Sequence, residues 1–173
     1  YWLDTVKSKK FDQIYHEHVT YFNFRMIKEM ISKTKLSFFK AKKVNYHGGS
    51  IRVYLKKNSN KNYQRQFKKL ISIEKNHKIY SLSSYKKFQI FIDNKKKNLL
   101  QKLKRLKSKK NVLIIGIGAA AKANTFLNTF ELSTKMVDFI TEASKHKIGK
   151  LTPKSRIPIY NDKILSRYKN KII

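Results

Sequence analysis

Apolar residues in the first part of the chain recur every three or four positions, which is the period of a helix with one buried face. Phe24, Ile27 and Ile31 follow this spacing and predict a helix over 24–34, which the Asn23 side chain can cap. Two further helices are predicted downstream, with lysines between their apolar residues. The shorter is predicted by Tyr63, Phe67, Leu70 and Ile71, and the longer by Phe88, Phe91, Ile92, Leu99, Leu103 and Leu106.

A β-hairpin is predicted between the first helix and the next two. Residues 41–46 and 51–57 flank the segment His47–Ser50, and the second flank alternates apolar and polar side chains. The flanked segment contains two consecutive glycines, which permit the positive φ angles of a tight turn.

The pattern changes after the helices. Asn111–Ile115 is a short apolar run typical of a buried parallel strand, and Met136–Ile140 and Ile157–Ile159 predict two more strands. A helical stretch separates the first two strands, Asp162–Tyr168 predicts a short helix, and Lys171–Ile173 predicts the start of another strand. This alternation predicts half of a Rossmann-like sheet.

The predicted fold class is therefore α/β, with a Rossmann-like parallel half-sheet at the C-terminal side, preceded by a helix, a β-hairpin and two basic helices. Residues 1–173 would form one domain, truncated at both ends, in three parts: 1–57 with the hairpin, 58–108 with the helices, and 109–173 with the Rossmann-like unit. The chain does not begin with Met, so we expect it to be part of a longer protein.

The composition is strongly basic, with 41 Lys and Arg against 10 Asp and Glu and a formal net charge of +31. One interpretation is a nucleic-acid-binding module without catalysis. The other is the codon bias of an AT-rich genome, which we favour because lysine far outnumbers arginine and is spread along the whole chain. In either case the charge favours anionic ligands, and we do not expect nucleic acid as the partner.

Two absences limit the possible functions. The chain has no cysteine, which excludes disulfides and thiolate metal sites within it. It has no run of about 18 apolar residues, so no membrane-spanning helix and no membrane partner are expected. We expect a cytoplasmic protein.

The segment Tyr15–His18 carries the candidate catalytic chemistry. Its sequence, Tyr-His-Glu-His, places a phenol, two imidazoles and a carboxylate within four positions. An imidazole can transfer protons near neutral pH, a carboxylate can orient it, and a phenol can donate a hydrogen bond to a developing oxyanion. In a helix, Tyr15 and His18 would share a face. Two alternatives stay open: the His-x-His pair could bind a metal with a further ligand, or the histidines could simply pack beside aromatic residues.

A glycine-rich loop follows the first predicted strand. The pattern Gly116-x-Gly118-x-x-Ala121 before a helix can seat a pyrophosphate on backbone amides, with Lys122 adding a positive charge. The same pattern also serves helix–strand packing alone. A further alternative is an NAD-binding oxidoreductase. Against it, no acidic residue stands at the end of the second predicted strand, since Glu142 comes two places after that end.

Together these segments resemble the C-terminal region of the NDP-hexose C-methyltransferases, which methylate C-3 of 4-keto deoxysugar nucleotides. The resemblance rests on segments in the family's order and spacing: Phe11–His18 with Tyr21 and Phe22, His47–Tyr54, Gly116–Lys122 with Asn124 and Thr125, Lys147–Pro153 and Ile157–Ile159.

The resemblance implies roles for the candidate residues. His18 would be the general base, Tyr15 would hydrogen-bond the ketone oxygen as it becomes an enolate, and Glu17 would orient or stabilise an imidazole. The substrate would be a nucleotide-linked sugar. The candidate substrate-binding residues are His47, Gly49, Ser50, Gly116, Gly118, Lys122 and Asn124.

The resemblance also implies cofactors that these residues would not bind. S-adenosylmethionine would occupy a middle domain, and zinc an N-terminal domain, both expected elsewhere in the same longer chain; these domains would be partners of this one. We expect residues 1–173 to be inactive alone. Two departures from the family pattern are Ala123 in place of a glycine and Thr141–Ala143 in place of an Asp-Arg-Asn-like triplet.

Overall fold

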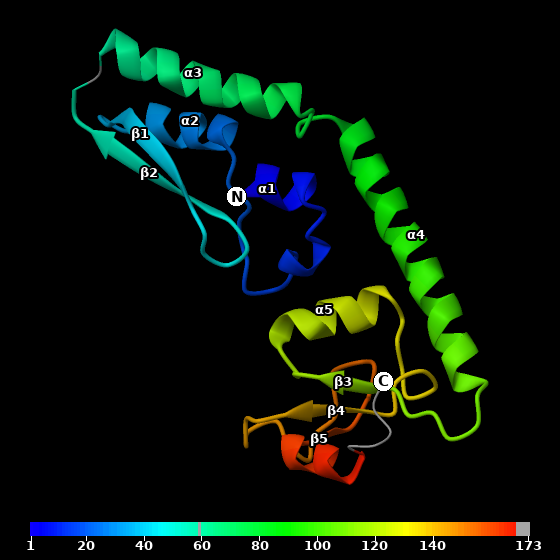
Figure 1. The fold of residues 1–173 in the computed structure, drawn as a ribbon. Coiled ribbons are helices and arrows are strands. Elements are labelled where there is room, and N and C mark those ends of the chain that lie inside the picture. Colours follow the sequence, from blue (N-terminus) through cyan, green and yellow to red (C-terminus); the bar gives the residue numbers. More distant parts are fainter. Residues whose placement is uncertain (59, 169–173) are drawn as a thin grey trace. The chain divides into compact units, whose positions relative to one another are not determined.

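The computed structural model describes residues 1–58 and 60–168, and the chain divides into two compact units, residues 1–92 and 93–173 (Figure 1). The long helix α4 (Leu82–Lys107) runs from the first unit into the second. Within the described part of the chain, no helix is both long and apolar enough to span a membrane.

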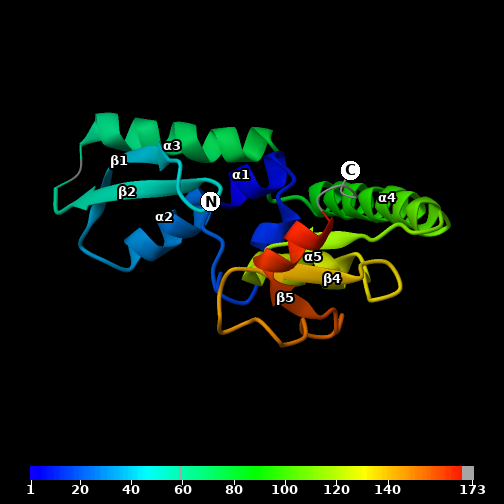
Figure 2. The ribbon, with the colours of Figure 1, turned by 60° about the horizontal axis from the view of Figure 1, so that its bottom comes forward.

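The first unit joins short helices, a hairpin and a long helix. Its elements in chain order are α1 (Trp2–Lys7), the 3-10 helix η1 (Phe11–Gln13), α2 (Phe24–Ser32), β1 (Ser37–Val44), β2 (Ser50–Lys56) and α3 (Lys61–Asn76). Helix α3 contacts both β1 and α2. Figure 2 shows α3 running alongside the hairpin. Phe24, Ile27 and Phe38 form the buried centre, and the Phe38 and Phe67 rings stack with centroids 4.5 Å apart.

The predicted elements of this unit are confirmed. The Asn23 side chain accepts a hydrogen bond from the Met26 amide at 2.9 Å, so it caps α2 as its chemistry predicts. Strands β1 and β2 pair antiparallel, with Val44 opposite Ser50 at the turn. The first strand begins earlier than expected, at Ser37. Helix α3 is also longer than expected, because the Asn60 side chain caps its start by accepting the Tyr63 amide.

One buried carboxylate joins α3 to the beginning of α2. Glu74 is completely inaccessible to solvent and accepts the Phe24 N–H at 2.9 Å. It also accepts hydrogen bonds from the hydroxyls of Tyr1 and Tyr80. Burial and these bonds to Glu74 raise the pKa of both phenols, so both remain protonated donors at neutral pH.

The second unit contains a three-stranded parallel sheet. Strands β3 (Ile115–Ile117), β4 (Phe139–Glu142) and β5 (Ile159–Asn161) lie in the order β3-β4-β5, and α5 (Ala121–Thr129) connects the first two. The α/β class is thus confirmed, with a parallel sheet and an antiparallel hairpin. The finer assignment to a Rossmann-like half-sheet stays a prediction.

The predicted strand positions in this unit were wrong by two to four residues. β3 begins at Ile115, where the predicted strand ends, because the Asp138 carboxylate accepts the Ile114 N–H at 2.7 Å in place of a strand partner. β4 and β5 are likewise shifted toward the C-terminus.

The predicted last helix is the 3-10 helix η2 (Asp162–Tyr168). The strand predicted at 171–173 lies outside the described residues.

Removing the Glu74 carboxylate should destabilise the first unit. In Glu74→Ala, the Phe24 amide and two hydroxyls lose their buried acceptor, and we expect the free energy of unfolding to fall by about 3 kcal/mol. Urea denaturation followed by circular dichroism measures this change. The control is Glu29→Ala on the exposed surface of α2, which should change stability by less than about 0.5 kcal/mol. Equal losses in both variants would contradict the assignment.

Candidate functional site

The Tyr15–His18 segment is a turn, not a helix. η1 ends at Gln13, and the His18 amide then donates to the Tyr15 carbonyl at 3.0 Å. This turn brings the Tyr15 and His18 rings to a centroid distance of 4.4 Å. The two side chains that helical geometry was expected to align are therefore brought together by a tighter backbone turn. Both are half-buried.

His18 has one ring nitrogen fixed by the backbone. Its Nδ1 lies 2.8 Å from the carbonyl oxygen of Gln13. A carbonyl oxygen can only accept, so Nδ1 carries the hydrogen, and in the neutral ring the lone pair is at Nε2. A histidine held in this way offers Nε2 as its proton acceptor.

Tyr15 and Glu17 form a pair within the same turn. The Tyr15 hydroxyl donates to Glu17 Oε2 at 3.2 Å. Burial, followed by this hydrogen bond, raises the pKa of Tyr15, so the phenol stays protonated and acts as a donor rather than as a base. Glu17 was expected to orient an imidazole. It lies 4.0 Å from Nε2 of the exposed His16, and the imidazole of His18 is oriented by Gln13 instead.

The hairpin turn lies beside the His18 ring. The His47 and His18 rings are 6.2 Å apart and nearly perpendicular. Gly48 has φ +81°, and a Cβ there would come within 3.2 Å of Gln13 Nε2. Gly49 has φ +122°, and a Cβ there would come within 3.2 Å of the Asp4 carboxylate. Both glycines are therefore required by backbone angle and by space.

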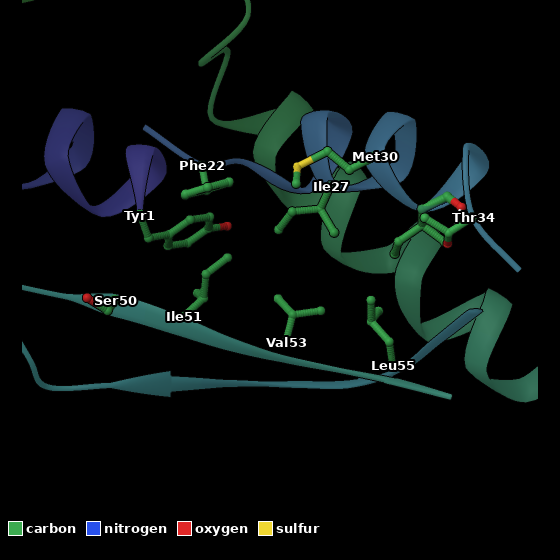
Figure 3. Close-up of a pocket in the computed structure, with 10 residues that line it drawn as sticks. Tyr1, Phe22, Ile27, Met30, Thr34, Ser50, Ile51, Val53 and Leu55 are labelled. Atoms are coloured by element: carbon green, nitrogen blue, oxygen red, sulfur yellow. Dashed lines mark hydrogen bonds between the residues drawn. The ribbon is translucent and has the colours of Figure 1, made fainter. Parts of the chain in front are cut away.

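A largely apolar cavity of about 430 Å³ lies between α2 and β2 (Figure 3). Its lining residues are Tyr1, Phe22, Ile27, Met30, Ile31, Thr34, Ser50, Ile51, Val53 and Leu55. Of the predicted site residues, only Ser50 lines it, and the Ser50 hydroxyl donates to the Tyr46 carbonyl at 3.0 Å. The cavity thus adjoins the hairpin end, while the Tyr15–His18 turn is not part of its wall.

The glycine-rich loop belongs to the second unit. Gly116 lies in β3, where a Cβ would come within 2.8 Å of Ile140, so this glycine permits close strand packing. Gly118 has φ +86° and its amide donates to the Thr141 carbonyl at 2.8 Å. Helix α5 then begins at Ala121, and Lys122 and Asn124 lie in its first turn, half-buried.

Glu142 is the last residue of β4, so the prediction that no acidic residue ends this strand was wrong. The error follows from the shifted strand. The Glu142 carboxylate accepts the amides of Ala119 and Ser144 at 3.0 and 3.1 Å, and Lys147 Nζ lies 3.3 Å from it. These bonds lower the pKa of Glu142, led by the bond from the Ser144 amide. The loop amides of Gly118 and Ala119 are therefore both occupied by protein acceptors.

The structure thus separates the predicted residues into two groups. Tyr15, Glu17 and His18 lie in one turn with His47 nearby, and Gly49 and Ser50 complete the adjoining hairpin. The second group, Gly116, Gly118, Lys122 and Asn124, lies around the loop of the other unit. Among the residues that the structure describes, no three His, Asp or Glu side chains are grouped to hold a metal ion.

Sequence analysis missed Gln13, whose backbone carbonyl orients His18. It also missed Tyr21, whose hydroxyl donates to the same carbonyl at 3.2 Å. Tyr21 stands within the resembling segment, but nothing in its position indicates a bond to a carbonyl eight residues earlier.

Comparison with known proteins identifies the class. Residues 45–173 match the family described as the C-methyltransferase C-terminal domain, and the chain belongs to this family. It is also 24% identical over 162 residues to the C-methyltransferase NovU of Streptomyces niveus. This alignment covers 93% of the present chain, so it includes the Tyr15–His18 turn, which the family match does not reach. The chain spans only 38% of the length of that relative.

The charge state of Glu142 can be tested directly. Because its folded pKa is lowered, Glu142 stabilises the loop above its ordinary titration range, and this contribution is lost as pH falls through the lowered pKa. We expect a ¹³C NMR titration to place the Glu142 midpoint below 4.5, and Lys147→Ala to raise it. Lys145→Ala, a neighbouring exposed lysine, is the matched control. An unchanged midpoint in Lys147→Ala would contradict the pairing.

Proposed function

We propose that this domain supplies the base for C-methylation of a keto sugar attached to a nucleotide. The observation that supports the proposal best is the geometry of His18, whose Nδ1–H is fixed by the Gln13 carbonyl and whose Nε2 is left as the proton acceptor. Membership of the C-methyltransferase C-terminal domain family and the similarity to NovU support the reaction type.

The proposed step is removal of a proton from the carbon next to the ketone. His18 Nε2 takes the proton, and the electron pair of the C–H bond forms the C=C bond of an enolate while the ketone oxygen gains negative charge. Tyr15 remains protonated and donates a hydrogen bond to that oxygen, with Glu17 holding the hydroxyl in place beforehand. S-adenosylmethionine, bound by another domain, would supply the methyl group to this carbon: its sulfur–methyl bond would break as the new carbon–carbon bond forms, and the electron pair would stay on the sulfur of the departing thioether. A positioned base and an oxyanion donor together accelerate such a step by roughly 10⁴-fold or more.

The methyl donor, S-adenosylmethionine, fits poorly onto the residues of this chain. The glycine-rich loop is the segment closest in pattern to a nucleotide site, but Glu142 and Lys147 already bond its backbone at Ala119. We therefore assign donor binding to a different domain of the intact methyltransferase. We likewise assign zinc to another domain, because these residues include no cysteine and no three described His, Asp or Glu side chains are grouped to hold it.

The nucleotide part of the substrate would meet a basic protein, which favours its diphosphate. As a separate proposal for the second unit, Lys122 and Asn124 at the start of α5 are the candidate phosphate contacts, because Gly116 packs against Ile140 and the Gly118 amide is bonded to the Thr141 carbonyl. His47, Gly49 and Ser50 are the proposed contacts beside the base.

The base can be tested without the methyl donor. In D₂O and without the methyl donor, a nucleotide-linked 4-keto deoxyhexose should exchange the hydrogen next to its ketone when the intact methyltransferase is added, and ¹H NMR follows the loss of that resonance. His18→Asn should slow this exchange by about 10²-fold or more, since it removes the proton acceptor. When the methyl donor is also added, the same His18→Asn substitution reports on methyl transfer.

The matched control is His16→Asn. His16 lies two residues away in the same turn, but its side chain is 80% exposed. We expect its exchange rate to stay within about twofold of the parent protein. Near-normal exchange by a folded His18→Asn protein would show that another group is the base.

A further inference from the structure

We propose that Tyr21 is a positioning residue that sets the protonation geometry of His18 through a shared backbone carbonyl. This proposal deepens the proposed function and rests on it for the catalytic role of His18. The carbonyl oxygen of Gln13 accepts His18 Nδ1 at 2.8 Å and the Tyr21 hydroxyl at 3.2 Å. Both of its acceptor positions are thereby used by residues of the same loop.

The Gln13 carbonyl stands at the end of a short helix, where the backbone changes direction. η1 has three residues, and Ile14 directly after it has φ −89° and ψ 88°, outside helical values. The N–H of the Gln13–Ile14 peptide donates to the Phe11 carbonyl at 2.9 Å, and the helix ends at this bond. The Tyr21 hydroxyl supplies a restraint from the other side of the turn, which keeps the oxygen directed at the His18 ring.

Tyr21 is itself held in place. Its ring packs edge-on against Trp2 at a centroid distance of 5.4 Å, and Trp2 Nε1 donates to the Tyr85 hydroxyl at 3.0 Å. The Tyr85 hydroxyl in turn donates to the Ile79 carbonyl at 2.6 Å. Tyr21, which restrains the Gln13 carbonyl, is thus connected through Trp2 and Tyr85 to the start of α4.

The Gln13 side chain is also held in place. Gln13 is buried, and its amide group lies against Gly48 of the hairpin turn, where even a Cβ would approach to 3.2 Å. The residue therefore connects the catalytic turn to the hairpin that carries His47. If the His18 ring carried its hydrogen on Nε2 instead, the lone pair of His18 Nδ1 would face the backbone carbonyl oxygen of Gln13, and the two would repel each other.

The tautomer of His18 is the direct test, and it is independent of activity. Long-range ¹H–¹⁵N NMR of the labelled chain at about pH 8, where an ordinary imidazole is neutral, distinguishes Nδ1–H from Nε2–H. We expect Nδ1–H in the parent protein and a mixture of both forms in Tyr21→Phe, which keeps the ring but loses the hydroxyl. In the exchange assay, Tyr21→Phe should lower the rate about three- to tenfold, with substrate affinity unchanged.

Controls separate a positioning role from a general loss of structure. Tyr160→Phe removes a more exposed hydroxyl from β5 and should leave the His18 tautomer unchanged. An amide spectrum of Tyr21→Phe close to that of the parent protein establishes that it folds. Trp2→Phe, which keeps an aromatic ring but loses the bond to Tyr85, should give a smaller shift in the same direction.

Two results would overturn the proposal: Nε2–H in the parent protein, or the parent tautomer unchanged in folded Tyr21→Phe. Failure of the proposed function would give a different experimental result. In that case His18→Asn would retain exchange, while the tautomer of His18 in the parent and Tyr21→Phe proteins would still follow the expectation.

Discussion

The buried carboxylate of Glu74 is the interaction on which the first unit depends. It accepts the amide of Phe24 at the start of α2 and the hydroxyls of Tyr1 and Tyr80. A buried carboxylate without these donors would be strongly unfavourable, so the ends it joins are fixed together. The candidate catalytic turn lies in the segment between Tyr1 and Phe24, which also contains α1 and η1, and both ends of this segment are held by one residue of α3. The Trp2 amide also joins the two ends by donating to the Phe22 carbonyl at 2.9 Å.

This arrangement explains how a turn without regular secondary structure can hold the proposed base in place. Functional side chains on loops need a rigid support, because small displacements weaken proton transfer. Here the support is made of backbone acceptors and aromatic packing rather than of a helix or strand. The Gln13 carbonyl orients His18, and Gly48 leaves room for the Gln13 side chain. The half-buried His18 ring is thus oriented by a residue that is itself buried.

Hydrogen bonds between residues close in sequence could be predicted, and hydrogen bonds to acceptors distant in sequence could not. The Asn23 cap and the hairpin follow from side chains within a few positions of the backbone they stabilise. The start of β3 was misplaced because Asp138, 24 residues away, takes the Ile114 amide. The position of Glu142 at the end of β4 was missed because it is set by pairing with Asn161 of β5, which is distant in sequence. The Tyr15–His18 segment was recognised from its residue types, but the group that orients His18 is a backbone carbonyl, and every residue has one.

The few acidic residues of this basic chain mostly bond groups within the protein. Most of the carboxylates described above have an internal structural partner: Asp138 bonds Lys107 and the Ile114 amide, Glu142 bonds Lys147, and Glu74 caps α2. Each of these three carboxylates fixes a backbone amide, and Asp138 and Glu142 also neutralise one lysine each. The net charge of +31 already includes them and acts as a field around the molecule. Such a field favours a nucleoside diphosphate without requiring a dedicated phosphate loop, which agrees with a glycine-rich segment whose amides at Gly118 and Ala119 are already bonded within the protein.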